Sequence, residues 1–329
     1  MKRFLFISLF VCICLFSCQT RSGSGNLPMS IGSAGEMLVI MRDYLWKGSY
    51  GDSVRKYFSE PVWGLPAQEP MYTMSQKDAL TPLLQRYRNV LIINVDPGFE
   101  YSNIRVRENL HANNQVVYNV DVPSADSIVS CVYKNKDRII AHFLMKDRDA
   151  IIQDYKRNVA RPVVDSLKKK FMIDILIPKP YELDVDRDNF VWISREEGHR
   201  TWGILIWEQP YLRLSQLDTD SLIFNMNAMT RRHVPGRRVG SYMADEPLVP
   251  PEVKRFYKND IYCVQLNGLW QMENGFMGGP YVNHTIVDIQ RGRLVTAMGF
   301  VFYPNREKRQ MIRQLEAILY TMNPLVNSD

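Results

Sequence analysis

The chain of 329 residues has little of what marks unusual protein classes. It contains only five cysteines, 18 glycines and 18 prolines, and low-complexity runs are few. Because 46% of its residues are apolar and 11% are aromatic, the composition excludes a disordered chain, a collagen-like chain and a small disulfide framework. The sequence therefore belongs to a folded protein of one large domain or two smaller ones.

Signatures of common enzymes are also absent from the sequence. There is no Gly-x-Ser-x-Gly elbow, no phosphate-binding Gly-x-x-x-x-Gly-Lys-Ser/Thr loop, no Gly-x-Gly-x-x-Gly and no His-Glu-x-x-His. The five histidines lie far apart without the spacing of metal ligands. We therefore predict no metal and no cofactor, while a site assembled from distant residues stays open.

The apolar run over residues 4–16 is too short for a membrane span, which needs about 20 residues. Lys2 and Arg3 precede it, and Ser17 and Cys18 follow, which is the layout of a secretory signal. Residues 15–18, Leu-Phe-Ser-Cys, resemble the bacterial lipobox. The resemblance implies cleavage after residue 17 and acylation of Cys18 with chains such as palmitate. An uncleaved N-terminal anchor with a chance cysteine is the alternative.

Removal of the signal changes the charge of the protein. Residues 18–329 number 312, and the loss of Lys2 and Arg3 lowers the net charge from +6 to +4. Residues 18–33 are expected to form a flexible tether that follows the anchor. No acidic run follows Cys18, so we expect the outer membrane, facing the periplasm. The expected partners are the membrane through its lipid anchor, and an anionic lipid, a glycan or an envelope protein, but not nucleic acid.

Apolar patterning predicts an α+β protein with mixed or antiparallel sheets and helices packed on one face. Strands are expected over residues 36–41, 90–95, 116–122, 128–133 and 138–145, and a helix over residues 78–87. A long helix begins at residue 150, a hairpin is expected around residues 196–199, and the clearest helix follows Asn305. We expect an N-terminal lobe over residues 34–175 and a C-terminal lobe over residues 176–329, which could be similarly built.

Three stretches of the last third carry a family resemblance. They are Gly-Leu-Trp-Gln-Met at 268–272, Phe-Met-Gly-Gly-Pro-Tyr-Val-Asn-His at 276–284 and Gly-Phe-Val-Phe-Tyr-Pro at 299–304. With the lipobox and Pro-Val-Trp-Gly-Leu-Pro at 61–66, they resemble a Bacteroidetes lipoprotein family catalogued as domain of unknown function 4837. The resemblance implies a family that covers nearly all of the mature chain, a cell-envelope location and no assigned catalytic residue.

The segment 270–284 combines glycines with aromatic side chains and is the candidate ligand site. Glycines allow a loop to approach a ligand closely, and aromatic rings supply apolar contact area. The candidate ligand-binding residues are Trp270, Phe276, Met277, Gly278, Gly279, Tyr281, Asn283 and His284. The alternative is a structural hairpin whose glycines fix a turn and whose aromatic rings lie in the core.

Three functions remain open. A non-catalytic envelope component that binds a ligand or an assembly partner is the leading hypothesis. An envelope hydrolase acting on glycan or lipid is the second, with His284 and either Asp288 or Glu273 as acid and base, because His284 and Asp288 share strand parity. A purely structural scaffold is the third.

Cysteines and clustered cations complete the set of candidates. Cys131 and Cys263 lie in predicted strands of different lobes, where a disulfide and separate burial as small apolar residues are both open. Arginines gather at 231–232 and 237–238, where lipid head groups or anionic glycans could bind, or where the loop is merely solvated. Cations at 306–309 oppose the dipole of the last helix, which indicates an anionic partner there.

Overall fold

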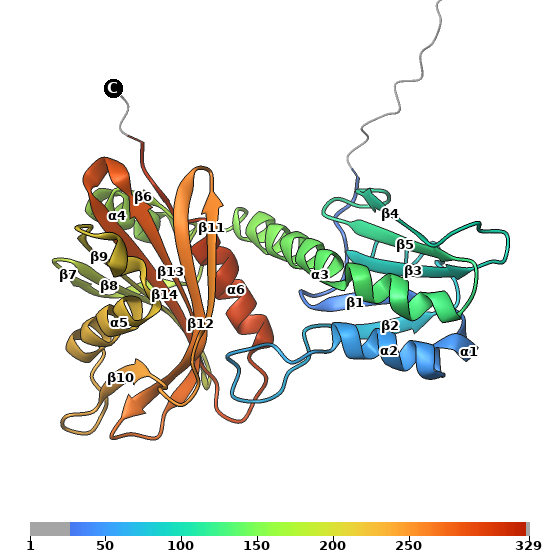
Figure 1. The fold of residues 1–329 in the computed structure, drawn as a ribbon. Coiled ribbons are helices and arrows are strands. Elements are labelled where there is room, and N and C mark those ends of the chain that lie inside the picture. The colour runs from blue at the N-terminus through green and yellow to red at the C-terminus, as the bar shows by residue number, and fades with distance from the viewer. Residues whose placement is uncertain (1–26, 327–329) are drawn as a thin grey trace, which may run out of the picture.

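The computed structural model describes residues 27–326, which form two lobes connected by a long helix (Figure 1). The predicted signal peptide (1–17), the predicted lipidation site Cys18 and the tether up to residue 26 lie outside the described residues. The α+β class is confirmed, with one mixed and one antiparallel sheet in the two lobes.

The N-terminal lobe contains a five-stranded sheet in the order β2-β1-β3-β5-β4. Its strands are β1 (Glu36–Ile40), β2 (Thr73–Lys77), β3 (Asn89–Val95), β4 (Asn103–Glu108) and β5 (Val116–Val122). Only β4 runs antiparallel to its neighbour. Of the three inner strands, β3 and β5 are nearly continuous apolar runs because both of their faces are covered.

Helices cover one face of this sheet. They are α1 (Asp43–Trp46), α2 (Ser49–Phe58) and α3 (Asp126–Tyr155), and their apolar side chains share one core with the strands. The other face is covered by residues 78–88, whose Leu80, Leu84 and Tyr87 pack on Val90 and Val117. The helix expected over residues 78–87 is wrong, because this segment consists of turns.

Helix α3 replaces two strands that the sequence patterning predicted at 128–133 and 138–145. Its buried side chains recur at helical spacing, at Ile128, Val132, Ile139 and Phe143. At 30 residues, α3 is about 45 Å long. It therefore extends from the N-terminal lobe to the C-terminal lobe, where it packs against α6 (Arg309–Tyr320) (Figure 1).

The C-terminal lobe contains an eight-stranded antiparallel sheet. Its main order is β10-β12-β13-β14-β9-β8-β7, with β11 paired to β12. The strands are β7 (Glu182–Arg187), β8 (Phe190–Glu197), β9 (Arg200–Pro210), β10 (Tyr242–Asp245), β11 (Glu252–Lys258), β12 (Ile261–Glu273), β13 (Gly278–Asp288) and β14 (Arg293–Phe302). Since the N-terminal sheet is mostly parallel, the two lobes are not similarly built.

Helices lie on both faces of the C-terminal sheet, rather than on one face as predicted. Helix α5 (Thr219–His233) covers one core, and α4 (Arg161–Phe171) and α6 cover the other. Tyr281 and Val287 of β13 face the first core, whereas Val282 and Ile286 face the second. Because alternate side chains of β13 and β14 are buried on both sides, two covering layers are needed.

The change of lobe comes earlier in the chain than the expected boundary at 175/176. The buried side chains of α4, such as Val163, Leu167 and Phe171, belong to the core of the C-terminal lobe. Strand β6 (Ile173–Asp174) also pairs with β15 (Asn323–Pro324) near the C-terminus. The chain therefore passes from one lobe to the other at residues 156–160, between α3 and α4. Two short 3-10 helices, Leu214–Leu217 and Ile289–Arg291, complete the elements.

Candidate functional site

The predicted ligand segment 270–284 forms the β12–β13 hairpin and does not enclose a cavity of its own. Trp270 and Tyr281 lie in the core under α5. The Trp270 indole donates to the Val301 carbonyl (3.2 Å), and the Tyr281 hydroxyl donates to the Asp245 carboxylate (2.6 Å). These two rings therefore stabilise the sheet, as in the structural-hairpin interpretation.

The remaining members of the segment divide between core and solvent. Asn283 is buried against the sulfur of Met226. Gly279 allows its backbone to approach that of Val301, because a Cβ on Gly279 would lie 2.1 Å from the Val301 carbonyl oxygen. Gly278, Met277 and Phe276 are exposed at the turn. The eight candidate residues are thus not gathered around one ligand site.

The predicted pairing of His284 with a carboxylate is wrong. His284 is 1% exposed, and its Nε2 lies 2.9 Å from the Gln265 side-chain oxygen. Burial lowers the pKa of His284 to about 3. Asp288 lies four residues along the strand, about 13 Å away, and binds Arg291 (3.2 Å) and Arg293 (2.9 Å). Glu273 lies at the far end of β12, where it accepts a hydrogen bond from Gln271 (3.4 Å).

The two cysteines are free thiols rather than a disulfide. Cys131 lies on α3 in the core of the N-terminal lobe, and Cys263 lies on β12 in the core of the C-terminal lobe. Cys131 was expected in a strand, and the change to a helix places it in a different layer. Burial raises the pKa of the Cys263 thiol to about 12. Of the two interpretations, the structure shows separate burial.

Within residues 27–326, no three His, Cys, Asp or Glu side chains gather as a metal site. No helix of this part of the chain has the length and apolar character to cross a bilayer.

The start of α6 is an anchoring point between the two lobes. Glu69, only 3% exposed, accepts hydrogen bonds from the backbone nitrogens of Lys308 and Arg309, both at 2.8 Å. Its carboxylate is the anion expected beside the cations of this helix, and it belongs to the other lobe. Asn305, expected as the cap, lies before the helix, which begins at Arg309. Glu69 therefore satisfies free N–H groups and the helix dipole together.

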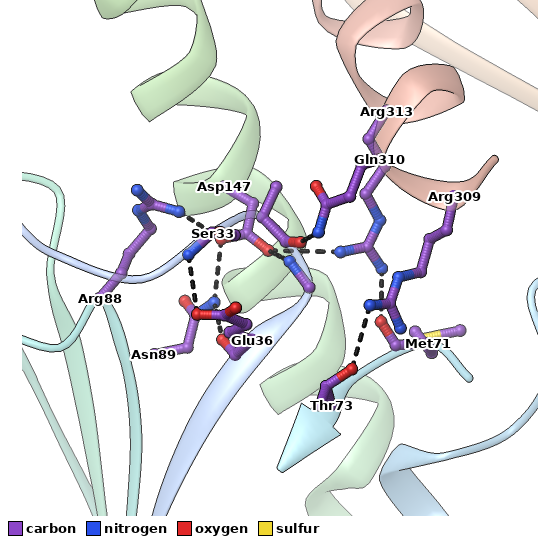
Figure 2. A network of polar contacts seen from close by, with 12 residues as sticks. Ser33, Glu36, Met71, Thr73, Arg88, Asn89, Asp147, Arg309, Gln310 and Arg313 are labelled. Atoms are coloured by element: carbon purple, nitrogen blue, oxygen red, sulfur yellow. Dashed lines mark hydrogen bonds and ion pairs between the residues drawn. The ribbon is translucent and has the colours of Figure 1, made fainter. Parts of the chain in front are cut away.

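A second anchoring point is the Asp147 carboxylate on α3, which is 2% exposed (Figure 2). Its hydrogen-bond donors are Gly35 N (2.8 Å), Arg88 Nη1 (3.0 Å), Asn89 Nδ2 (3.0 Å) and Arg313 Nη1 (3.5 Å). Arg313 comes from α6, so Asp147 connects the lobes. Arg313 also donates to the Met71 carbonyl (2.7 Å). Two arginines balance this buried charge, as a buried carboxylate requires.

Beside these contacts, the lobes enclose a cavity of about 290 Å³. Residues 60–71, here called the strap, leave the N-terminal lobe and close the cavity against β12. Gly64 has a φ of +73°, and a Cβ there would lie 3.2 Å from the Gly268 nitrogen. The Trp63 indole donates to the Pro250 carbonyl (3.1 Å). A glycine in the left-handed region is thus what allows the strap to lie against the strand.

The cavity wall is mostly apolar and carries charges of both signs. Its apolar side chains include Leu65, Leu144, Ile151, Val282 and Ile312. Each of its four carboxylates has a partner. They are Asp147, Glu60 with Lys136 (3.6 Å), Glu252 with Lys254 (3.0 Å) and Glu316 with Gln265 (3.0 Å).

Arg148 is the exception among the charged side chains of the cavity. Its guanidinium stacks on the Tyr320 ring, 3.5 Å from the ring centre. Its Nε is buried without a hydrogen-bond acceptor, and no described residue forms an ion pair with it. A cation held by an aromatic ring at the wall of an apolar cavity can bind the anionic group of an amphipathic ligand.

Sequence patterning did not reveal this site. Its residues come from the strap, α3, β11, β12, β13 and α6, which are far apart in the chain. Two signals were available, the Trp-Gly pair at 63–64, already noted for its family resemblance, and Tyr281, a predicted ligand-binding residue that also lines the cavity. Arg148 gave none, because the helix was predicted to begin only at residue 150, whereas α3 begins at Asp126.

Comparisons with known proteins find distant likenesses. The Ran-binding protein Mog1p of Saccharomyces cerevisiae is 8% identical, with a TM-score of 0.33, over 47% of this chain and 90% of that chain. LpqN, described as involved in cell envelope biogenesis of Mycobacterium tuberculosis, is 13% identical, with a TM-score of 0.29, over 46% of this chain and 83% of that chain. Likenesses this distant carry no argument. A search of curated proteins returns no significant match.

Family models match each lobe separately. Residues 30–156 match a domain of unknown function, DUF8532, and residues 160–321 match another, DUF4837. The expected family resemblance is thus confirmed in the C-terminal lobe but does not extend over nearly all of the mature chain. The gap between the two matches, at residues 157–159, coincides with the passage between α3 and α4. The C-terminal lobe is therefore similar to the DUF4837 family over residues 160–321.

Proposed function

We propose that the protein is a membrane-anchored envelope lipoprotein that binds an amphipathic anion in the cavity between its lobes, without converting it chemically. Arg148 carries the proposal, because it is a cation at an apolar cavity wall with a buried Nε and no anionic partner among the described residues. Burial of an alkyl chain against the apolar side chains would supply the affinity, and Arg148 would select a negative head group.

The other two functions receive less support. The envelope hydrolase depended on His284 with a carboxylate, and His284 instead contacts Gln265 in the core. The scaffold interpretation requires no cavity, whereas a cavity of about 290 Å³ is close to the lower limit of small-molecule sites. The lipid anchor and the envelope location remain predictions from residues 1–18.

The binding test uses residues 18–329 with Cys18→Ser, called the unlipidated chain, which retains every described residue and carries no acyl chain. Octanoate and octanol are titrated by calorimetry. They share the alkyl chain and differ in head-group charge. We expect octanoate to bind more tightly than octanol, and Arg148→Gln to lower octanoate affinity about ten-fold or more without changing that of octanol.

Arg157→Gln is the matched control, since it removes the same charge just beyond α3, where Arg157 is exposed. The proposal is overturned if octanoate does not bind, or if Arg148→Gln and Arg157→Gln bind it equally. The absence of binding would leave the scaffold function in place. Turnover of an ester of octanoate that is lost in His284→Ala would instead support the hydrolase.

A further inference from the structure

Two loops that are distant in sequence meet at one end of the C-terminal lobe. Residues 235–241 precede β10, and residues 274–277 form the β12–β13 turn. The loops are neighbours because β10 pairs with β12, with Tyr242 opposite Glu273. A Cβ on Gly275 of the second loop would lie 3.4 Å from the Ser241 Oγ of the first, so the two loops are in contact. We call these two loops the tip. It lies at the foot of the lobe in Figure 1, beside and below β10.

Apolar side chains project from the tip into solvent. Val239 is 104% exposed, Phe276 is 90% exposed and Met277 is 42% exposed. Isolated exposed apolar residues are common, but here three from two separate loops share one end of the lobe. The backbone holds the first loop in shape, since the Gly236 nitrogen donates to the Ser241 carbonyl (2.8 Å). The exposed side chain of Val239 therefore lies in an ordered loop.

Four arginines lie within the first loop of the tip or just before it in the chain. Arg231 and Arg232 end α5, and Arg237 and Arg238 lie in the first loop. Arg238 stacks over the Phe276 ring at 4.8 Å, and Arg231 over the Tyr242 ring at 4.9 Å. None of the four forms an ion pair with another residue in the described part of the chain. The tip thus presents positive charge, with one acid, Glu273, beside its second loop.

We propose that the tip is a membrane-docking site that inserts Val239 and Phe276 into an anionic lipid surface, with the arginines at the level of the head groups. Charge complementarity identifies the occupant, because arginines around exposed apolar side chains match a surface that is anionic outside and apolar beneath. The tip lies apart from the inter-lobe cavity. It gives the C-terminal lobe its own contact with a membrane, in addition to the predicted anchor that precedes the N-terminal lobe.

Sedimentation with vesicles tests the proposal on the unlipidated chain. One vesicle preparation contains phosphatidylglycerol and phosphatidylethanolamine, and the other contains phosphatidylcholine alone. We expect binding to the anionic vesicles, little binding to the neutral ones and weakening by salt. Arg237→Gln with Arg238→Gln should lower the affinity about 25-fold, at about five-fold per charge. Phe276→Ser should lower it at least about ten-fold.

The matched control variants remove an apolar side chain or two positive charges at positions away from the tip. Leu83→Ser removes an apolar side chain that is 82% exposed in the N-terminal lobe, and Lys156→Gln with Arg157→Gln removes two charges. Both should bind anionic vesicles like the parent chain. The proposal is overturned if the parent chain ignores anionic vesicles, or if tip variants and controls bind equally. Pull-down of an envelope protein that depends on Phe276, without vesicle binding, would also contradict it and point to a protein partner.

Discussion

The carboxylate of Glu69 caps a helix of the other lobe, with its Oε2 2.8 Å from the backbone nitrogen of Arg309. The contact crosses 240 residues of sequence and explains why a helix can begin with cations. Glu69 supplies the negative charge that the first turn of α6 lacks.

Glu69→Ala should therefore destabilise the protein by about 2–3 kcal/mol, because two buried N–H groups and a helix start lose their acceptor. Urea unfolding at pH 7 measures the change. Glu60→Ala is the control in the same strap. Its side chain is 53% exposed and 3.6 Å from Lys136, so a loss below about 1 kcal/mol is expected. Equal losses in the two variants would contradict a capping role.

Asp147→Ala should cost about 3–5 kcal/mol, because it leaves Arg88 and Arg313 buried without their shared carboxylate. Thermal unfolding followed by circular dichroism measures the loss. Asp154→Ala, at the exposed end of α3 and 3.7 Å from Arg157, should change the midpoint little. A small effect of Asp147→Ala would show that the lobes do not depend on this contact.

Because the pKa of the buried His284 is lowered, we expect the protein to lose stability in mild acid. Burial holds its folded-state pKa at about 3, whereas the unfolded chain binds a proton near pH 6.5. Between these values the unfolded state holds more protons, so stability is complete above pH 6.5 and falls as the pH decreases. The expected loss is about 1.4 kcal/mol per pH unit, or about 2 kcal/mol from pH 6.5 to pH 5.

Urea unfolding at several pH values compares the parent chain with His284→Gln, in which this part of the slope should disappear. His199→Gln changes an exposed histidine of the β8–β9 turn and should keep the slope of the parent. Burial also lowers the pKa of His142, so some acid sensitivity should remain in every variant. A slope unchanged in His284→Gln would refute the prediction.

The free cysteines can be counted directly. The unlipidated chain, unfolded in urea without reductant, should react with two equivalents of a thiol reagent. In the folded state both thiols should react slowly, because they are buried and the pKa of Cys263 is raised to about 12. A count of zero in urea would show a disulfide and require a different arrangement of the cores.

Sequence patterning predicted the elements whose apolar residues follow a single period. Helix α6 has one buried stripe, with Met311, Leu315, Ile318 and Leu319 in the core, as expected. Strands β8 and β9 form the expected hairpin, with Gly198 at a φ of +60° in the turn. In these elements local pattern and tertiary packing indicate the same structure.

Prediction failed for segments whose apolar residues fit more than one period, and for contacts between residues that are far apart in the chain. Residues 128–145 contain clustered apolar side chains that suggest strands, and only the core of the N-terminal lobe shows that Ile128, Val132 and Ile139 form one helical stripe. The inter-lobe site needed tertiary structure, because Asp147 and Arg313 are 166 residues apart. Patterns within a window of 20 residues contain no information on such pairs.

Each lobe matches a family model of its own, yet the partners of Glu69 and Asp147 are divided between them. A fragment that contained only the N-terminal lobe would expose Glu69 without its partners and Asp147 without Arg313. One that contained only the C-terminal lobe would leave α6 without a cap. The two domains are therefore expected to be inherited as a pair. A different N-terminal domain would have to supply a carboxylate for the start of α6, and a different C-terminal domain would have to replace the contact of Arg313 with Asp147.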